Sequence, residues 1–298
     1  MNFKQIMRLL PDDQRQQIQN VINTLRLGGR SEKTIENYVH AIHRFLKYFK
    51  DEDISKFTEA DIIEYIKNSY INKSCAVNTY NMNICAIKYF YVINFNKEFN
   101  NKLLPRAKLT KKLPETVNKE TFIKILNEEK NLKHKCWLLL AYCSGLRAEE
   151  VASIKLKDIN VKEHKLKVLG KRKKERFTIL PDITIKYLRL YYKAYYFKRY
   201  FHKTNKTGYL FEGNQNAEHI DSGTIINYFT TLKRKYNLDD NITFHSLRHS
   251  FATNFIKAGG DTFTLKSMLG HSSLNTTSIY VHMGRDFNNL KGVKYEQI

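Results

Sequence analysis

Cysteines and long apolar runs are scarce in this sequence, and each shortage excludes a class of protein. The 298 residues include only Cys75, Cys85, Cys136 and Cys143, with no CxxC pair, so neither a disulfide-stapled secreted domain nor a zinc ribbon is expected. Each cysteine lies within an apolar helical pattern, which predicts buried, reduced thiols. No run approaches the ~18 apolar residues of a membrane span, and Met1–Leu10 lacks a signal-peptide core. We therefore expect a cytoplasmic protein with no membrane partner.

Acidic residues are also few, with 29 against 51 basic ones and a net charge of +22. Residues 1–112 hold 19 basic and 11 acidic side chains, and residues 113–298 hold 32 and 18. A chain of this length suits two domains, each able to bury its own core. Charge alone also fits a membrane-surface protein or a plain basic one. Two basic halves nevertheless favour a protein that grips double-stranded DNA over one with a single basic tail.

The first half of the sequence has the periodicity of a helical bundle. Apolar residues at i, i+3, i+4 and i+7 predict a helix over Thr34–Phe49, capped by Ser31. Three more helices are expected, at Asp12–Leu27 before Gly28-Gly29, at Glu59–Asn68 after Thr58, and at Ala76–Asn94 after Ser74.

Basic side chains on the exposed faces of this bundle are predicted to bind DNA phosphates, which fixes position rather than reading sequence. The candidates are Lys33, Arg44, Lys73 and Lys88. For any one of these residues alone, a solvated helix surface is the simpler explanation. Residues 105–116 follow as a basic segment punctuated by Pro105 and Pro114, which predicts a linker between a helical domain over 1–104 and a second domain over 117–298.

The second half mixes helices with one strand pair. The expected elements are a helix over Lys119–Glu129, a buried core helix over Cys136–Cys143, a helix restarting after Ser144-Gly145, strands over Lys165–Leu169 and Arg176–Leu180, and helices over Tyr187–Phe201 and Ile225–Tyr236. The fold class is therefore mainly α with a small β-hairpin or sheet. The turn between the strands holds Lys171, Arg172, Lys173 and Lys174. This basic turn is either an arm for a DNA groove or a solvated loop.

The segment from Thr243 to His282 is dense in groups that can handle a phosphate. Thr243 can cap a helix in which His245 and Arg248 are three apart, so we expect both side chains to point together out of one helix face. A short helix over Thr262–Leu269 ends at Gly270, which places His271 on a turn and Tyr280 nine residues later. Taken singly, each histidine suits a buried structural role, as we expect for His249.

Several of these boxes together resemble the tyrosine recombinases of the phage-integrase family. The boxes are GLRAEE (145–150), GKRKKER (170–176), HSLRHSFAT (245–253), LGHSS (269–273) and Tyr280. Their order and gaps fit the family, whereas HxxR alone would be a weak signal. The resemblance extends, more weakly, to the N-terminal half. It implies a simple two-domain, Xer-like or mobile-element integrase, with a helical core-binding bundle before an α-rich mixed catalytic domain and a C-terminal tail at 281–298.

The resemblance assigns catalytic roles to Arg147, Lys171, His245, Arg248, His271 and the nucleophile Tyr280. The two guanidiniums match the oxygens of a phosphodiester and would neutralise charge in the transition state. A phenol with a pKa of about 10 needs a base, and His245 can take its proton. His271 can donate to a phosphate oxygen, and Lys171 can protonate the departing 5′ oxygen, although Lys173 or Lys174 are alternatives.

The activity implied is site-specific recombination for integration, excision or resolution through a 3′-phosphotyrosyl intermediate. The enzyme is expected to act as a nucleoid-associated tetramer on two DNA sites, with its tail docked either on a neighbouring subunit or on its own. No cofactor is expected, since the sequence has neither a two-metal carboxylate cluster nor a GxxxxGK[ST] loop. The alternatives are a type IB topoisomerase-like nicking–closing enzyme and a catalytically silent, architectural DNA-binding protein.

Overall fold

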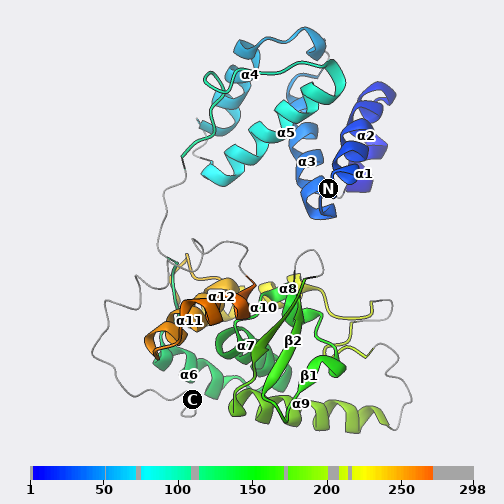
Figure 1. Ribbon diagram of the computed structural model, residues 1–298. Helices are drawn as coiled ribbons and strands as arrows, with labels where there is room; N and C mark the ends of the chain where they lie inside the picture. The colour runs from blue at the N-terminus through cyan, green and yellow to red at the C-terminus, as the bar shows by residue number, and fades with distance from the viewer. Residues whose placement is uncertain are drawn as a thin grey trace. The chain divides into compact units, whose positions relative to one another are not determined.

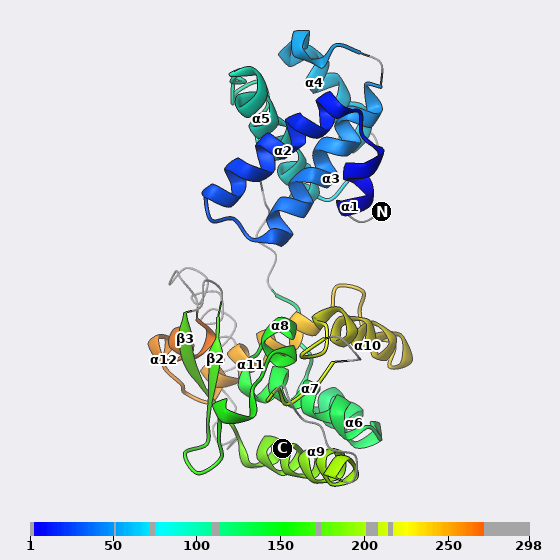
Figure 2. The ribbon, with the colours of Figure 1, turned by 90° about the vertical axis from the view of Figure 1, so that its right-hand side faces the viewer.

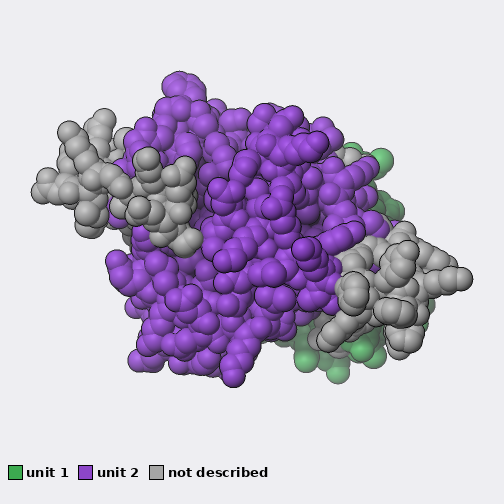
Figure 3. Space-filling view, turned by 90° about the horizontal axis from the view of Figure 1, so that it is seen from below, with its two compact units in different colours: residues 1–111 green, residues 112–298 purple. Residues whose placement is uncertain are grey.

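The chain folds into two compact units, residues 1–111 and 112–298, coloured separately in Figure 3. The structure is a computed structural model that describes residues 3–50, 52–71, 75–108, 114–170, 174–200, 208–213 and 217–270. Each unit has an apolar core of its own. The predicted fold class is confirmed, because helices dominate both units and one small sheet lies in the second.

The first unit is a bundle of helices (Figure 1). Its α-helices are α1 (Phe3–Leu9), α2 (Asp12–Leu27), α3 (Glu32–Tyr48), α4 (Glu59–Ile66) and α5 (Val77–Phe95). A 3-10 turn, η1 (Ile54–Lys56), precedes α4 and a π-helical turn, η2 (Lys67–Ile71), follows it. The sequence pattern missed α1, because seven residues are too few for a clear period. It also extended α4 into the π-helical turn.

Local signals and one aromatic residue organise this bundle. Ser31 caps α3 as predicted, since its side chain accepts a hydrogen bond from the backbone amide of Thr34. Phe45 is fully buried at the centre, with edge-to-face contacts to Tyr65 at 5.2 Å and Tyr91 at 5.9 Å between ring centroids. The core thus combines the apolar stripe of α3 with aromatic rings from α4 and α5.

The described ends of the predicted linker are attached to different units. Asn81 of α5 exchanges two hydrogen bonds with the backbone of Ala107, at 3.0 and 2.8 Å. Val117 is buried in the core of the second unit, and its amide donates to Ser250 Oγ at 2.8 Å. Residues 109–113 lie outside the described part of the chain, so a linker over 105–116 stays a prediction.

The second unit surrounds one buried helix with a layer of helices and a three-stranded sheet. Its elements are α6 (Lys119–Glu128), α7 (Leu132–Ser144), α8 (Ala148–Ala152), η3 (Leu156–Asp158), β1 (Ile159–Asn160), β2 (Lys165–Leu169), β3 (Glu175–Ile179), α9 (Asp182–Tyr200), α10 (Ser222–Lys235), α11 (Phe244–Lys257) and α12 (Thr262–Leu269). The sheet is antiparallel in the order β1-β2-β3. Figure 2 shows β3 standing beside α12. The two-residue β1 was not predicted, and α9 begins five residues earlier than its tyrosine-rich pattern suggested.

Helix α7 is the core helix that its apolar run predicted. Every residue from Cys136 to Ser144 is buried, and α7 packs against α9 and α11. The thiols of Cys136 and Cys143 are free and buried as expected, but Cys75 and Cys85 are only half-buried, which corrects the prediction for these two. Both lie in the smaller bundle, Cys75 just before α5 begins. No helix in the described ranges is both long and apolar enough to cross a membrane.

Gly145 ends α7 in a left-handed conformation with φ of 69°, and a Cβ there would lie 2.5 Å from a ring carbon of the buried Phe251. Replacing Gly145 by Ala is therefore expected to lower the free energy of unfolding by about 2–5 kcal/mol, from backbone strain plus overpacking. Urea unfolding measures this loss. Gly259→Ala is the matched control, because its φ is 89° but nothing lies within 4 Å of its Cβ position. Equal losses at both sites would contradict the packing argument.

Candidate active site

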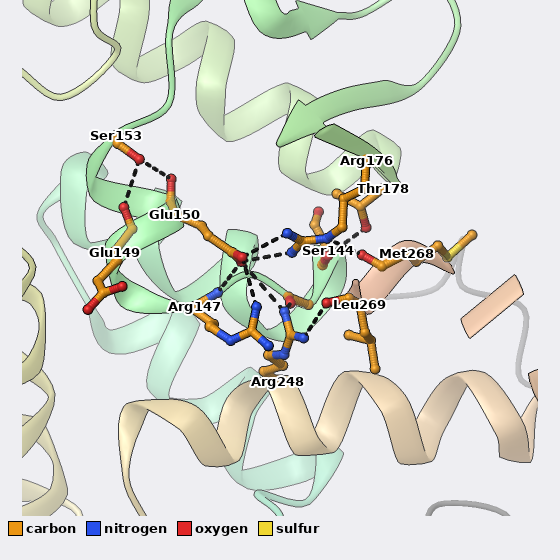
Figure 4. Close-up of polar contacts among 11 residues, drawn as sticks. Ser144, Arg147, Glu149, Glu150, Ser153, Arg176, Thr178, Arg248, Met268 and Leu269 are labelled. Carbon is orange, nitrogen blue, oxygen red and sulfur yellow. Dashed lines mark hydrogen bonds and ion pairs between the residues drawn. The ribbon is translucent and has the colours of Figure 1, made fainter. Parts of the chain in front are cut away.

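A single buried carboxylate, that of Glu150, brings three arginines together at the centre of the second unit (Figure 4). Glu150 lies in α8 and its side chain is 6% exposed. Arg176 donates to both carboxylate oxygens, at 2.7 and 2.8 Å, and Arg147 donates to Oε1 at 2.9 Å. The third guanidinium, Arg248, lies 3.5 Å from Oε2. Figure 4 shows Arg176 on one side of the carboxylate, with Arg147 and Arg248 on the other.

Arg147 occupies the N-cap of α8, the helix junction that the sequence predicted. Its backbone amide donates to Glu150 Oε2 at 2.9 Å, and its guanidinium donates to Oε1 of the same side chain. The Arg147 side chain remains 37% exposed. One carboxylate thus fixes both the backbone and the side chain of Arg147, while part of that side chain stays accessible to a ligand.

Arg248 corrects the prediction that His245 and Arg248 point together out of α11. The Arg248 side chain is buried and donates from Nη1 to the carbonyl oxygen of Gly145 at 2.7 Å and from Nη2 to that of Leu269 at 2.6 Å. Its guanidinium therefore bridges the last turns of α7 and α12. The helical period placed the two residues on one face, but it did not show that two helix ends meet over Arg248 and bury it, while His245 is exposed.

Arg176 and Glu150 are the site residues that the sequence analysis did not single out. Arg176 was predicted only as the start of a strand, and Glu150 appeared only as the last residue of the GLRAEE box. In the structure Arg176 is buried in β3, and its Nε donates to the carbonyl oxygen of Met268 at 2.6 Å. The alternation in β3 gave no signal for this, because it sets Phe177 and Ile179 on one face and Arg176 on the other, which predicts an outward arginine. In the structure Phe177 is exposed and Arg176 is buried. A buried guanidinium needs an anionic partner, and Glu150 supplies it.

The charges within this cluster control the protonation of Glu150. Burial raises the pKa of its carboxyl group, but the hydrogen bonds and charge of Arg176, the amide of Arg147 and the charge of Arg248 outweigh burial and lower it. Glu150 is therefore ionised at neutral pH. One negative charge against three guanidiniums leaves a net positive cluster, which suits an approaching phosphate.

His245 lies beside this cluster with an exposed edge, and its ring contacts that of His249 at 4.6 Å between centroids. Partial burial, with the positive charges of Arg248 and Arg147, lowers the pKa of His245 to about 4, while Glu150 opposes the shift. The imidazole of His245 is neutral at pH 7 and can accept a proton.

We expect the imidazole of His245 in the free, folded protein to titrate near pH 4, well below its ordinary pKa of about 6.5. NMR titration of the ring proton, assigned by its absence in His245→Asn, measures this value. Because the folded protein then binds fewer protons than the unfolded chain between these two pH values, His245 lowers stability as the pH falls through that window. Arg147→Gln should raise the pKa of His245, since it removes a nearby positive charge. Titration of the wild-type ring near pH 6.5 would contradict the assignment.

Six of the sequence-predicted residues lie outside the described part of the chain. They are Lys73, Lys171, Arg172, Lys173, His271 and Tyr280. The structure describes the residues directly before Lys171 and His271. The backbone amide of Gly170 donates to the carbonyl oxygen of Lys174 at 2.8 Å, which closes the β2–β3 pair just before its turn. Gly270 ends α12 in a left-handed conformation, directly before His271.

The described DNA-binding candidates differ in their exposure to solvent and in the partners of their charged groups. Lys174 and Lys33 are exposed, although Lys33 pairs with Glu36 at 3.3 Å. Arg44 is exposed yet donates to Asn83 Oδ1 at 2.8 Å. Lys88 corrects the prediction of an exposed charge: it is half-buried, and its Nζ donates to the carbonyl oxygen of Leu104 at 2.8 Å. Burial lowers the pKa of Lys88.

Two protein-family models match this chain. The phage integrase family matches residues 115–285, and the phage integrase N-terminal SAM-like domain matches residues 18–99. The described residues Glu150, Arg147, Arg176, His245 and Arg248 all lie within the first match. A relative, tyrosine recombinase XerD of Staphylococcus haemolyticus strain JCSC1435, is 28% identical over 268 residues, covering 86% of this chain and 90% of the relative.

Solved structures share the fold at low sequence identity. A lambda integrase dimer bound to a core site aligns with a TM-score of 0.70 and 19% identity, covering 94% of this chain and 98% of that one. A lambda integrase tetramer bound to a Holliday junction gives 0.67 and 19%, covering 87% and 77%. The predicted resemblance and the predicted enzyme class, a site-specific DNA recombinase, are confirmed. The phage integrase family model matches more than half of the residues of this chain, so the chain belongs to the phage integrase family.

Proposed function

We propose that this protein cleaves and rejoins DNA at specific sites, with Tyr280 as nucleophile and a 3′-phosphotyrosyl intermediate. The observation that carries the proposal is the cluster of Arg147, Arg248 and a neutral His245 around one buried carboxylate. Anchored guanidiniums need no reorganisation when charge develops on a phosphate, which is the condition for strong electrostatic catalysis. The partly exposed Arg147 and the exposed edge of His245 give the phosphate access from one side.

The proposed reaction is a transesterification in which bonds and protons balance. The phenol oxygen of Tyr280 attacks the scissile phosphorus, and its proton passes to His245. The bond to the 5′ oxygen breaks, and Lys171 protonates that oxygen to give a 5′ hydroxyl. Arg147 and His271 hold the non-bridging oxygens, and the buried guanidinium of Arg248 adds positive charge beside them. The negative phosphate also offsets the arginine charges that depress the pKa of His245, so bound DNA makes this imidazole a better base.

Rejoining reverses these steps with the 5′ hydroxyl of another strand, so strand exchange conserves the phosphodiester bond without a cofactor. We propose a tetramer acting on two double-stranded sites, as in the lambda integrase tetramer bound to a Holliday junction. The C-terminal residues, about 281–298, would link its subunits or dock on their own subunit. Integration, excision or resolution of DNA would take place on the nucleoid in the cytoplasm. We propose that Lys33, Arg44, Lys73, Arg172, Lys173 and Lys174 contact the DNA backbone. Among the described candidates Lys88 is the least available, because it is half-buried and its Nζ donates to the carbonyl oxygen of Leu104.

The test is to trap the covalent intermediate from the wild-type protein. Fragmented genomic DNA from the source organism is incubated with the protein, adducts are isolated under denaturing conditions, and the attached peptide is identified by mass spectrometry. We expect a nucleotide on the Tyr280 peptide, joined through the 3′ phosphate, with recurrent cleavage positions. Relaxation of any supercoiled plasmid without recurrent sites would favour a topoisomerase-like enzyme. DNA binding with no adduct would favour an architectural protein.

A further inference from the structure

We propose that Arg176 is a positioning residue for DNA cleavage, because it ties strand β3, helix α8 and the C-terminal end of α12 into one rigid unit. The inference rests on the proposed function. Arg176 itself does not touch the phosphate in this account. Its role is to hold the two chain segments that lead to Lys171 and His271 in register with Arg147 and Arg248.

Arg176 is built into the sheet next to the basic turn. It pairs with Val168 in the β2–β3 ladder, one pair from the last, and lies five residues after Lys171 in the chain. Its side chain leaves the sheet on the buried face, where it is 6% exposed. A fixed guanidinium at this point therefore fixes the base of the strand pair that carries the proposed general acid.

The same side chain reaches two other elements. Nη1 and Nη2 donate to the carboxylate of Glu150 in α8 at 2.7 and 2.8 Å, and Nε donates to the carbonyl oxygen of Met268 in α12 at 2.6 Å. Its methylene stem packs on Gly270, where a Cβ would lie only 2.9 Å from Arg176 Cδ. Figure 4 shows Arg176 lying between Glu150 and Met268. His271 follows Gly270 directly in the sequence, so this contact fixes the last described residue before it.

Only arginine can make this set of contacts at once. Its planar fork offers two parallel donors to a carboxylate and a third, Nε, in a fixed direction, whereas lysine offers one compact ammonium group. Arg248 repeats the arrangement on the opposite side, joining Leu269 of α12 to Gly145, the residue that ends α7. The last two carbonyl groups of α12 are thus each held by a different buried arginine. Glu150 in turn forms ion pairs with both Arg176 and Arg248.

The proposal is tested with Arg176→Lys, compared with the wild-type protein on nicked DNA that carries a cleavage site mapped from the wild-type adduct. Single-turnover adduct formation at saturating DNA gives a rate constant and an amplitude, and a binding titration gives the affinity. We expect the rate constant to fall on the order of 100-fold, as displaced catalytic groups predict. The affinity for DNA and the amplitude per folded molecule should not change.

The amplitude separates positioning from a merely structural role. A residue needed only for folding would lower the amplitude and leave the rate constant of the folded fraction at the wild-type value, and that result would overturn the proposal. If Arg176→Lys yields little folded protein, Arg176→Gln, which keeps a hydrogen-bond donor for Glu150, is measured in the same way and judged by the same criterion.

The matched control is Arg189→Lys, on the exposed face of α9. It makes the same chemical change away from the cluster and should keep the wild-type rate constant. A wild-type protein that forms no adduct would contradict the proposed function. A wild-type adduct with an unimpaired Arg176→Lys rate constant contradicts the positioning role alone.

Discussion

Tyr280→Phe is expected to abolish the covalent DNA adduct while leaving DNA binding intact. The substitution removes one oxygen atom, the atom proposed to attack phosphorus, and keeps the aromatic ring. Because the covalent bond to phosphorus needs this atom, the loss should exceed the 10²–10³-fold range typical of deleting one stabilising donor, about 3–4 kcal/mol. The adduct is measured by gel shift under denaturing conditions, and binding by titration with the same DNA.

Two comparisons make this result specific. Tyr228→Phe is the control, because Tyr228 lies in α10 with its hydroxyl bonded to Glu129 Oε2 at 2.5 Å, outside the arginine cluster. It should retain adduct formation in its folded fraction. Residual adduct in Tyr280→Phe, mapped to another tyrosine, would move the nucleophile to that residue. Loss of DNA binding together with the adduct would show that Tyr280 supports the fold rather than the chemistry.

Glu150→Gln is expected to destabilise the second unit by about 3–5 kcal/mol at neutral pH, because it removes the negative charge that Glu150 places beside the buried guanidiniums of Arg176 and Arg248. A loss of this size is a large part of the stability of a typical domain. Urea unfolding measures it. The cleavage rate constant should fall as well, since Arg147 and Arg248 lose their shared anchor.

The pH dependence of this loss has a definite sign. The pKa of Glu150 is lower in the folded protein than in the unfolded chain, so its contribution to stability is fully present above the ordinary glutamate pKa. That contribution disappears as the pH falls through the lowered value. The difference between wild type and Glu150→Gln should therefore shrink in acid. Glu149→Gln, an exposed neighbour in the same helical turn, is the control and should cost little. Equal stability of the two variants would contradict the buried-anchor account.

The sequence was sufficient for features that depend on local spacing. Apolar period and side-chain caps predicted α3 with Ser31 as its cap, and Thr243 at the start of α11. A short helix and its glycine stop were predicted at Thr262–Leu269 with the observed bounds. These features follow from contacts between residues three or four apart. The spacing of several boxes in one register likewise identified the family, which the family match confirms.

The contacts between residues far apart in the sequence were visible only in the tertiary structure. The sequence placed Arg248 on a helix face, but only the fold shows that the ends of α7 and α12 meet over it and bury its guanidinium. The sequence showed Arg176 only as a strand residue. The packing of β3 against α8 and α12 gives it Glu150 and Met268 as partners. Periodicity reports which side of an element is apolar. It contains nothing about which distant carbonyl or carboxylate will face a buried cation, because that pairing is set by how the elements pack.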